Sequence, residues 1–209
     1  MFSVMYIANG CSAYRFKVWK ILVSSVILTL AGVLGAKLMY LIENGSFDGT
    51  SFYGAVFLPP LIMYFVAKLL SIPEKKLVDL CAPAECIMLA LLKVQCLRSG
   101  CCGGRTFHTL SGAEFIFPSQ IAELITGLVI MVALLLIMNR RKNVGKIYPI
   151  YMIIYGILRF ILNLFRKTTP FIWILPAGNF WSIISIAVGI IWCSVLSPKN
   201  KPKAQLKRE

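Results

Sequence analysis

The sequence predicts an all-α polytopic membrane protein with about six transmembrane helices and both termini in the cytoplasm. Of its 209 residues, 58% are hydrophobic, and the mean hydropathy is +0.79. A soluble domain needs far less apolar surface than this. Six apolar stretches each approach the roughly 20 residues that cross a bilayer, and basic residues concentrate in alternate loops. These two observations carry the prediction.

The six stretches lie at 19–42, 52–72, 77–97, 118–138, 147–165 and 180–197. The third is the least apolar, because it contains Asp79, Glu85 and Lys93. Pro59 and Pro60 interrupt the second, which a span tolerates where neighbouring helices satisfy the freed carbonyls. Residues 1–10 are apolar but too few for a span. We therefore expect a cytoplasmic segment 1–18, a transmembrane domain 19–197 and a basic cytoplasmic tail 198–209.

The orientation follows from the loops, because cytoplasmic loops carry an excess of Lys and Arg. Fifteen basic residues precede the first stretch, follow the second, follow the fourth or lie in the tail. The alternate loops hold four: Arg98, Arg105, Arg166 and Lys167. The formal net charge of +14 is thus mainly a topology signal, and the Lys-rich tail also favours an anionic inner leaflet. We expect membrane lipids, and no nucleic acid, as partners.

The seven cysteines do not form a metal-binding pattern. No C-x-x-C pair occurs, and His108 is the single histidine, so we expect no metal and no cofactor. Most of the cysteines lie in or beside spans, where a thiol behaves as a small apolar group. A bridge from Cys96 to Cys101 or to Cys102 stays open.

Ionisable residues inside spans are expensive and therefore indicate a functional site. With the orientation above, Lys37, Lys93 and Arg159 all lie in the outer half of their helices, and Glu123 lies one turn below the outer end of its own. Lys37 either belongs to a site or extends its ammonium to the interface. Glu123 is either a catalytic acid or a counter-ion. Arg159 needs an anionic partner, because a guanidinium cannot lose its charge.

The segment Lys93–Gly104 predicts a helix end followed by a glycine-rich turn. Glycines such as Gly100 permit positive φ and close backbone approach, so free N–H groups can face an anion. Beside Lys93 and Arg98, this turn is a candidate cradle for a lipid phosphate.

Six segments, in order between about residues 30 and 190, resemble the motifs of bacterial prolipoprotein diacylglyceryl transferases. The family patterns G-A-R-L-x-Y, S-F-H-G-G, R-x-G-x-F-x-N-G, P-x-Q-L-Y-E, Y-G-x-x-R-F-x-x-E-x-x-R and G-Q-x-x-S are similar to Gly35–Asn44, Ser51–Ala55, Lys93–Gly104, Pro118–Glu123, Tyr155–Arg166 and Gly178–Ser182, respectively. Each likeness is modest, and the ordered set identifies the superfamily.

Several motif positions match the family, and others differ. The matches are Gly54, Gly100, Gln120, Glu123 and Arg159. Tyr53 stands where the family has His, Lys93 where it has Arg, Ser99 where it has Asn, and Asn163 where it has an acid. The resemblance therefore implies the fold and the lipid-binding geometry more directly than it implies the activity.

The resemblance implies transfer of a diacylglyceryl group from phosphatidylglycerol to the lipobox cysteine of a prolipoprotein, at the outer face of the bacterial cytoplasmic membrane. Arg159 would hold the leaving phosphate, Lys93 would add a second positive charge and Tyr53 would hydrogen-bond the headgroup. The predicted lipid-binding residues are Lys37, Gly54, Ser99, Gly100, Gln120, Glu123 and Asn163. The alternative is a non-catalytic lipid-binding or partner-binding membrane protein on the same fold.

Overall fold

The computed structural model describes residues 1–11, 14–101, 103–108, 114–139, 143–166, 170–172 and 175–196. The basic tail 198–209, Cys102, Arg140, Arg141, Lys142 and Lys167 lie outside this part. In chain order, the elements are α1 (Phe2–Asn9), α2 (Val18–Asn44), α3 (Phe52–Leu69), α4 (Glu74–Ser99), β1 (Thr106–His108), β2 (Glu114–Ile116), α5 (Ser119–Met138), α6 (Ile147–Leu164), β3 (Pro170–Ile172), β4 (Leu175–Pro176) and α7 (Ala177–Val195).

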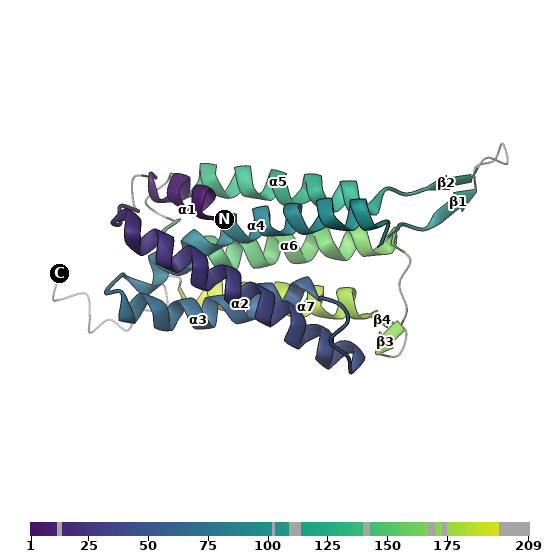
Figure 1. Cartoon of the computed structure of the whole chain (residues 1–209), viewed down its shortest axis with the longest axis horizontal. Helices are drawn as coiled ribbons and strands as arrows, with labels where there is room; N and C mark the ends of the chain where they lie inside the picture. The colour runs from purple at the N-terminus through teal and green to yellow at the C-terminus, as the bar shows by residue number, and fades with distance from the viewer. Residues whose placement is uncertain are drawn as a thin grey trace.

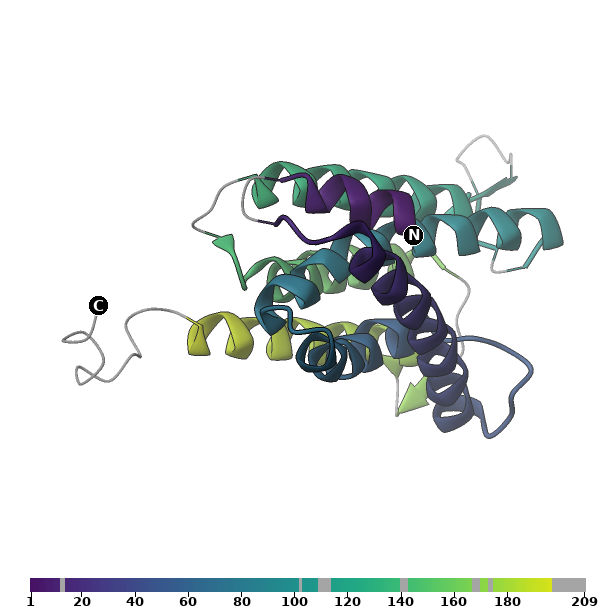
Figure 2. The same ribbon diagram turned by 60° about the vertical axis from the view of Figure 1, so that its left-hand side comes forward.

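The helices form a bundle in which α4 is the central element. The main pairs are α2 with α3, α4 with α5, and α6 with α7, and α4 also contacts α1, α3 and α6. Figure 1 shows α4, α5 and α6 running side by side, with α2 crossing the bundle obliquely beside α3. The view in Figure 2 shows the same oblique course of α2 across its neighbours.

Each predicted stretch corresponds to one long helix, which confirms the all-α polytopic fold class. The helices α2, α3, α5, α6 and α7 are long and apolar enough to cross a membrane. Large apolar side chains on these helices face outward, as Leu30, Leu69, Leu136 and Ile191 do, and a lipid environment accommodates such a surface. The start of α2 and the end of α7 lie at the same end of the bundle (Figure 1). The side of the membrane that this end faces stays a prediction.

The helix α4 is less apolar than its neighbours because it contains several charged residues, three of which point into the protein. Asp79, Glu85 and Lys93 are all buried. With 26 residues, the helix is about 39 Å long at 1.5 Å per residue, which is enough to accompany its neighbours through a bilayer. Pro83 lies within it, as Pro59 and Pro60 lie within α3, which continues through both.

Three features go beyond the predicted segments. Residues 2–9 form the helix α1, which packs against α4 and α2 with Met5 and Ala8 fully buried. The strands β1 and β2 form an antiparallel hairpin that projects past the end of the bundle (Figure 1). A second, irregular pair joins β3 to β4. The assignment of residues 1–18 to a cytoplasmic segment stays a prediction.

The end of the bundle where α4 begins is held together by Asp79. Its carboxylate accepts a hydrogen bond from the Tyr14 hydroxyl at 2.8 Å. It also accepts from the backbone N–H groups of Gly145, Ile147 (3.0 Å) and Tyr148 (3.2 Å). The last two are among the N–H groups that the first turn of α6 leaves without intrahelical acceptors. Asp79 therefore caps α6 from a neighbouring helix and ties the segment before α2 to both.

The helices α2 and α3 cross in near contact at two glycines. A Cβ on Gly35 would collide with the backbone of Gly54, and a Cβ on Gly54 would collide with the backbone of Gly35. Beside this crossing, the Ser51 N–H donates to the Ala36 carbonyl at 3.0 Å. The short connection between the two helices is thereby fixed over the end of the bundle where a cavity opens.

Candidate functional site

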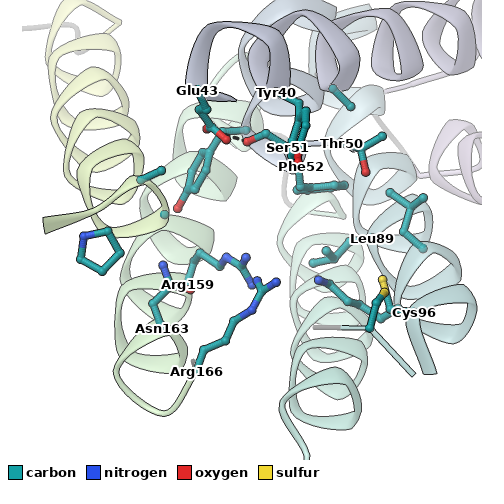
Figure 3. A pocket seen from close by; sticks show the side chains of 18 of the residues that line it. Tyr40, Glu43, Thr50, Ser51, Phe52, Leu89, Cys96, Arg159, Asn163 and Arg166 are labelled. Carbon is teal, nitrogen blue, oxygen red and sulfur yellow. Dashed lines mark hydrogen bonds between the residues drawn. The ribbon is translucent and has the colours of Figure 1, made fainter. Parts of the chain in front are cut away.

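A cavity of about 590 Å³ opens at the end of the bundle opposite Asp79. Its walls come from the ends of α2, α4 and α6, the starts of α3 and α7, and β4. The polar or sulfur-containing lining residues are Tyr40, Glu43, Thr50, Ser51, Tyr53, Lys93, Gln95, Cys96, Ser99, Cys101, Tyr155, Arg159, Asn163 and Arg166. Figure 3 shows this cavity, with Arg159 and Asn163 reaching toward it from α6 and Arg166 from just past the end of α6.

Three cations surround one buried carboxylate at the wall of the cavity. Glu123 Oε2 lies 2.7 Å from Lys93 Nζ and forms an ion pair with Arg159 NH1. Glu123 Oε1 lies 3.5 Å from Arg166 NH1. The Glu123 side chain is 3% exposed. Buried charges are tolerated when they are paired, and here one negative charge faces three positive ones. The surplus positive charge favours an anionic ligand in the cavity.

The spacing along α6 explains why Arg159 and Asn163 lie on one side of the helix. They follow at i and i+4, and this spacing places side chains on one face of a helix. Arg166 lies two residues past the end of α6, where it forms a β-bridge with Gly104. Lys93 reaches the site from the last two turns of α4, and Glu123 reaches it from the first turns of α5. Because α4 and α5 pack together, their charges converge.

Three residues at the cavity hold polar atoms that have no hydrogen-bond partner in the described part of the chain. They are Tyr155, through its hydroxyl, Arg159, through Nε, and Asn163, through both Nδ2 and Oδ1. Asn163 is 3% exposed and lies against Gly178, where a Cβ would collide with its amide nitrogen. Buried polar atoms are nearly always hydrogen-bonded. Unused donors beside surplus positive charge are suited to phosphate oxygens.

The Tyr53 hydroxyl is engaged at the far side of the cavity. It lies 2.6 Å from Ser182 Oγ, and Ser182 Oγ donates to the Gly178 carbonyl at 2.6 Å. A serine hydroxyl has one hydrogen, so in this arrangement Tyr53 is the donor to Ser182. The Tyr53 hydrogen is thus committed to the chain, while its oxygen can still accept.

The glycine-rich turn forms the rim of the cavity. Gly100 adopts the left-handed conformation with φ +65° and ends α4. Ser99 lines the cavity, and its hydroxyl donates to the Gln95 carbonyl at 3.0 Å. Gln120 does not line the cavity, but its amide nitrogen donates to the Cys101 carbonyl at 2.7 Å. It therefore fastens the rim to the start of α5.

The segment after this turn pairs with the end of α6 and thereby holds Arg166 in place. Gly104 forms a β-bridge with Arg166. The Arg105 N–H donates to the Phe165 carbonyl at 2.9 Å, and Arg105 Nε donates to the Arg166 carbonyl at 3.0 Å.

Five of the seven predicted lipid-binding residues are not among the residues that line the cavity. Gly100 and Gln120 lie at its rim, Glu123 pairs with cations that line it, and Lys37 and Gly54 make other contacts. Lys37 is half-buried, and its ammonium donates to the Phe47 carbonyl at 2.7 Å. Gly54 lies at the crossing with Gly35. The structure thus brings together Tyr53, Lys93, Ser99, Glu123, Arg159 and Asn163, with Gly100 and Gln120 at the rim.

Two further residues of the site were not among those singled out from the sequence. Arg166 lies in a loop of the predicted topology, and the structure also places it just past the end of α6, where its β-bridge with Gly104 brings it to the site. Glu43 lies at the end of α2 and lines the cavity; its position near Ser51 is set by the fold, so the sequence carried no signal for it. Within the described residues, no group of His, Cys, Asp and Glu is arranged to hold a metal ion.

Comparison with known proteins gives the family. The family model described as prolipoprotein diacylglyceryl transferase matches residues 1–195. A phosphatidylglycerol–prolipoprotein diacylglyceryl transferase of Clostridium tetani is 24% identical over 190 residues, covering 79% of this chain and 76% of the relative. A second such transferase, transferase 2 of Clostridium perfringens, is 25% identical over 211 residues, covering 87% and 81%. One from Geobacter sulfurreducens is 28% identical over 169 residues, covering 69% and 65%. The chain belongs to the prolipoprotein diacylglyceryl transferase family.

Proposed function

We propose that this protein transfers a diacylglyceryl group from phosphatidylglycerol to the lipobox cysteine of a prolipoprotein. The reaction would take place at the outer face of the bacterial cytoplasmic membrane. One observation carries the proposal: three cations meet one buried carboxylate beside a cavity at one end of a membrane-embedded bundle. The names of the relatives agree with this substrate pair.

The chemistry is a displacement at carbon. The thiol of the acceptor loses its proton, and the sulfur forms a C–S bond with the glyceryl carbon attached to the phosphate. The C–O bond to that phosphate breaks, its electron pair stays on oxygen, and glycerol phosphate leaves with one more negative charge than the diester had. The protein must hold the phosphodiester, stabilise the growing charge and accept the proton.

The α6 face is suited to the phosphodiester. Arg159 Nε and the Asn163 amide nitrogen are donors without partners in the described chain, and both residues line the cavity. A guanidinium presents donors in a planar fork that fits phosphate oxygens. Lys93 would add a compact positive charge from α4. Arg166, which also lines the cavity, is placed to stabilise the leaving group as its charge grows.

A second candidate is a lipid-binding or partner-binding protein that performs no transfer. The observation that favours it is the commitment of the Tyr53 hydroxyl to Ser182. Tyr53 stands at the family's His position and is a weak base near neutral pH, since the reference pKa of a tyrosine is about 10. In this alternative, the site binds the anionic lipid, and no residue removes the proton from a thiol.

Lipidation of a lipobox peptide distinguishes the two candidates. Purified protein in phosphatidylglycerol vesicles should convert the peptide cysteine to a diacylglyceryl thioether, detected as a mass increase and as released glycerol phosphate. A peptide with serine in place of the cysteine is the matched control and should stay unmodified. Phosphatidylglycerol binding without thioether at any pH between about 6 and 9 would overturn the transferase proposal and leave lipid binding.

A further inference from the structure

We propose that Glu43 is the base that takes the proton from the acceptor thiol. The inference rests on the transfer proposed above and identifies a residue that performs one of its steps. Lys93, Arg159 and Arg166, which we call the cation wall, explain how a phosphodiester is held. They do not explain which group accepts the proton of the acceptor thiol.

The other candidate bases are occupied or distant. Glu123 is held by Lys93, Arg159 and Arg166, and a carboxylate so compensated has little tendency to accept a proton. Tyr53 donates its hydrogen to Ser182. His108 lies on the projecting hairpin, with its side chain 71% exposed and paired with Glu114.

Glu43 is the carboxylate in the described lining of the cavity. It lies in the last turn of α2 and is half-buried. It forms no ion pair with any residue that the structure describes. The Ser51 hydroxyl donates to Glu43 Oε1 at 2.8 Å. A carboxylate has about four lone-pair positions, so this bond orients Glu43 and leaves acceptor capacity for a proton.

The position of Glu43 fits the geometry of the displacement. Glu43 and Ser51 lie on the wall made by α2 and the start of α3. Arg159 and Asn163 face the cavity from α6, and Arg166 faces it from just past the end of that helix (Figure 3). At a tetrahedral carbon, the nucleophile enters opposite the leaving oxygen. With the phosphate on the α6 wall, the thiol therefore approaches from the opposite side, where Glu43 is the available acceptor.

The step balances in atoms and charge. The S–H proton moves to a Glu43 carboxylate oxygen as sulfur bonds to carbon, and the C–O electron pair goes to the phosphate. Protonated Glu43 then returns its proton to the released glycerol phosphate or to water. The residue ends the cycle as a carboxylate, ready for the next acceptor.

The test is Glu43→Gln, measured as lipobox peptide lipidation in phosphatidylglycerol vesicles. The Gln amide oxygen can still accept the Ser51 hydrogen, so the local structure is preserved while the basic oxygen is lost. We expect transfer at pH 7 to fall by about 10²–10⁴-fold, the usual contribution of a general base. Phosphatidylglycerol binding should be kept or become tighter, because a negative charge has been removed from the cavity.

The pH profile separates a base from a residue that only positions the loop. Without a protein base, the reaction depends on free thiolate, so the Glu43→Gln rate should rise about tenfold per pH unit toward the thiol pKa of about 8.5. The deficit relative to the wild type should therefore shrink between about pH 6 and pH 9. Glu43→Asp, which keeps a carboxylate, should show a smaller loss with the wild-type profile.

Glu114→Gln is the matched control, because it makes the same substitution on the exposed hairpin, and it should leave the rate unchanged. A Glu43→Gln rate within threefold of the wild type at every pH would overturn the inference while leaving the transfer intact. A deficit of constant size across pH would assign Glu43 a positioning role and also overturn it. A wild type that transfers nothing would overturn the proposed function, and this inference with it.

Discussion

Asp79 and Glu123 are buried carboxylates near opposite ends of the same bundle, and their partners differ in kind. Asp79 accepts hydrogen bonds from the Tyr14 hydroxyl and from three backbone N–H groups, all of them neutral. Glu123 faces three cations. At Asp79, neutral donors satisfy the carboxylate, and this set of hydrogen bonds, the structural joint, holds the helices together. At Glu123, surplus positive charge and unused donors lie beside a cavity, where an anionic ligand can pair with them.

A third buried acid, Glu85, supports this distinction. It lies on α4 between the other two sites, and the Tyr148 hydroxyl lies 2.9 Å from each of its carboxyl oxygens. In the described part of the chain, no cation pairs with it. A buried acid is therefore not by itself a sign of function in this protein. The excess of cations is what marks the cavity end.

The largest effect should come from breaking the structural joint. Asp79→Ala removes the acceptor of four buried donors, and each unsatisfied donor costs about 1–3 kcal/mol. Taking the low end of this range for the four donors, we expect a total loss of about 3–5 kcal/mol in the free energy of unfolding, measured by thermal unfolding in detergent. Transfer per folded molecule should persist at low temperature.

Asp48→Ala is the control for this prediction, because Asp48 is an exposed residue of the α2–α3 connection. It should leave the free energy of unfolding unchanged.

The hydrogen bonds around Asp79 also predict a pH effect on stability. Burial, followed by the Asp79 charge, raises the pKa of Tyr14. A group whose pKa is raised on folding contributes stability that is lost as pH rises above its unfolded value of about 10. Tyr14→Phe should remove that alkaline loss, and persistence of the loss would contradict the assignment.

The next effect should come from the cation wall. Arg159→Lys keeps the charge but removes the planar fork and the unpartnered Nε. We expect a loss of about 1.5–3 kcal/mol, the range for a hydrogen bond to a charged group. This corresponds to about a 10–150-fold fall in kcat/KM for phosphatidylglycerol. Arg15→Lys, at an exposed position in the segment before α2, is the matched control. Equal rates for Arg159→Lys and wild type would remove Arg159 from the mechanism.

A smaller change is expected at Lys93, where the family has Arg. Lys93→Arg preserves the charge beside Glu123 and adds donors in a fork. The transfer rate should stay within about threefold of the wild type or rise, which corresponds to less than about 1 kcal/mol. A tenfold loss would mean that the compact ammonium, 2.7 Å from Glu123, is required by the packing of this chain. The same peptide assay measures it.

The sequence predicted the long helices well, because apolar length is a local property. Lys93, Glu123 and Arg159 were expected at one level of the membrane from helix direction alone, and they do meet. Which atoms remain without partners was not predictable, since the engagement of Tyr53 depends on Ser182, 129 positions away. The role of Glu43 was not predictable for the same reason. A glutamate in the last turn of a span is common at a membrane interface, and only the fold places this one beside a cavity.

The N-terminal segment shows the complementary limit. The eight residues of α1 are too few to span a membrane, but their length does not indicate whether they pack against other helices. Met5 and Ala8 are nevertheless fully buried, because α4 and α2 present a surface that accommodates a short helix. The burial of α1 thus depends on the helices packed against it, just as the hydrogen bonds of Asp79 depend on residues from other segments.

The smallest effect is expected at Lys37, which was predicted to bind lipid and which the structure places outside the cavity lining. Its ammonium reaches the Phe47 carbonyl at 2.7 Å in a partly exposed position. Replacing such a surface group usually changes stability by less than about 0.5 kcal/mol, and we expect a similarly small change, under about threefold, in KM for phosphatidylglycerol. Lys37→Gln should be compared with Lys68→Gln, which removes the same charge from the last turn of α3 near the opposite end of the bundle. If Lys37→Gln alone raises KM tenfold or more, the positive charge of the cavity end extends along α2, and Lys37 joins the lipid site after all.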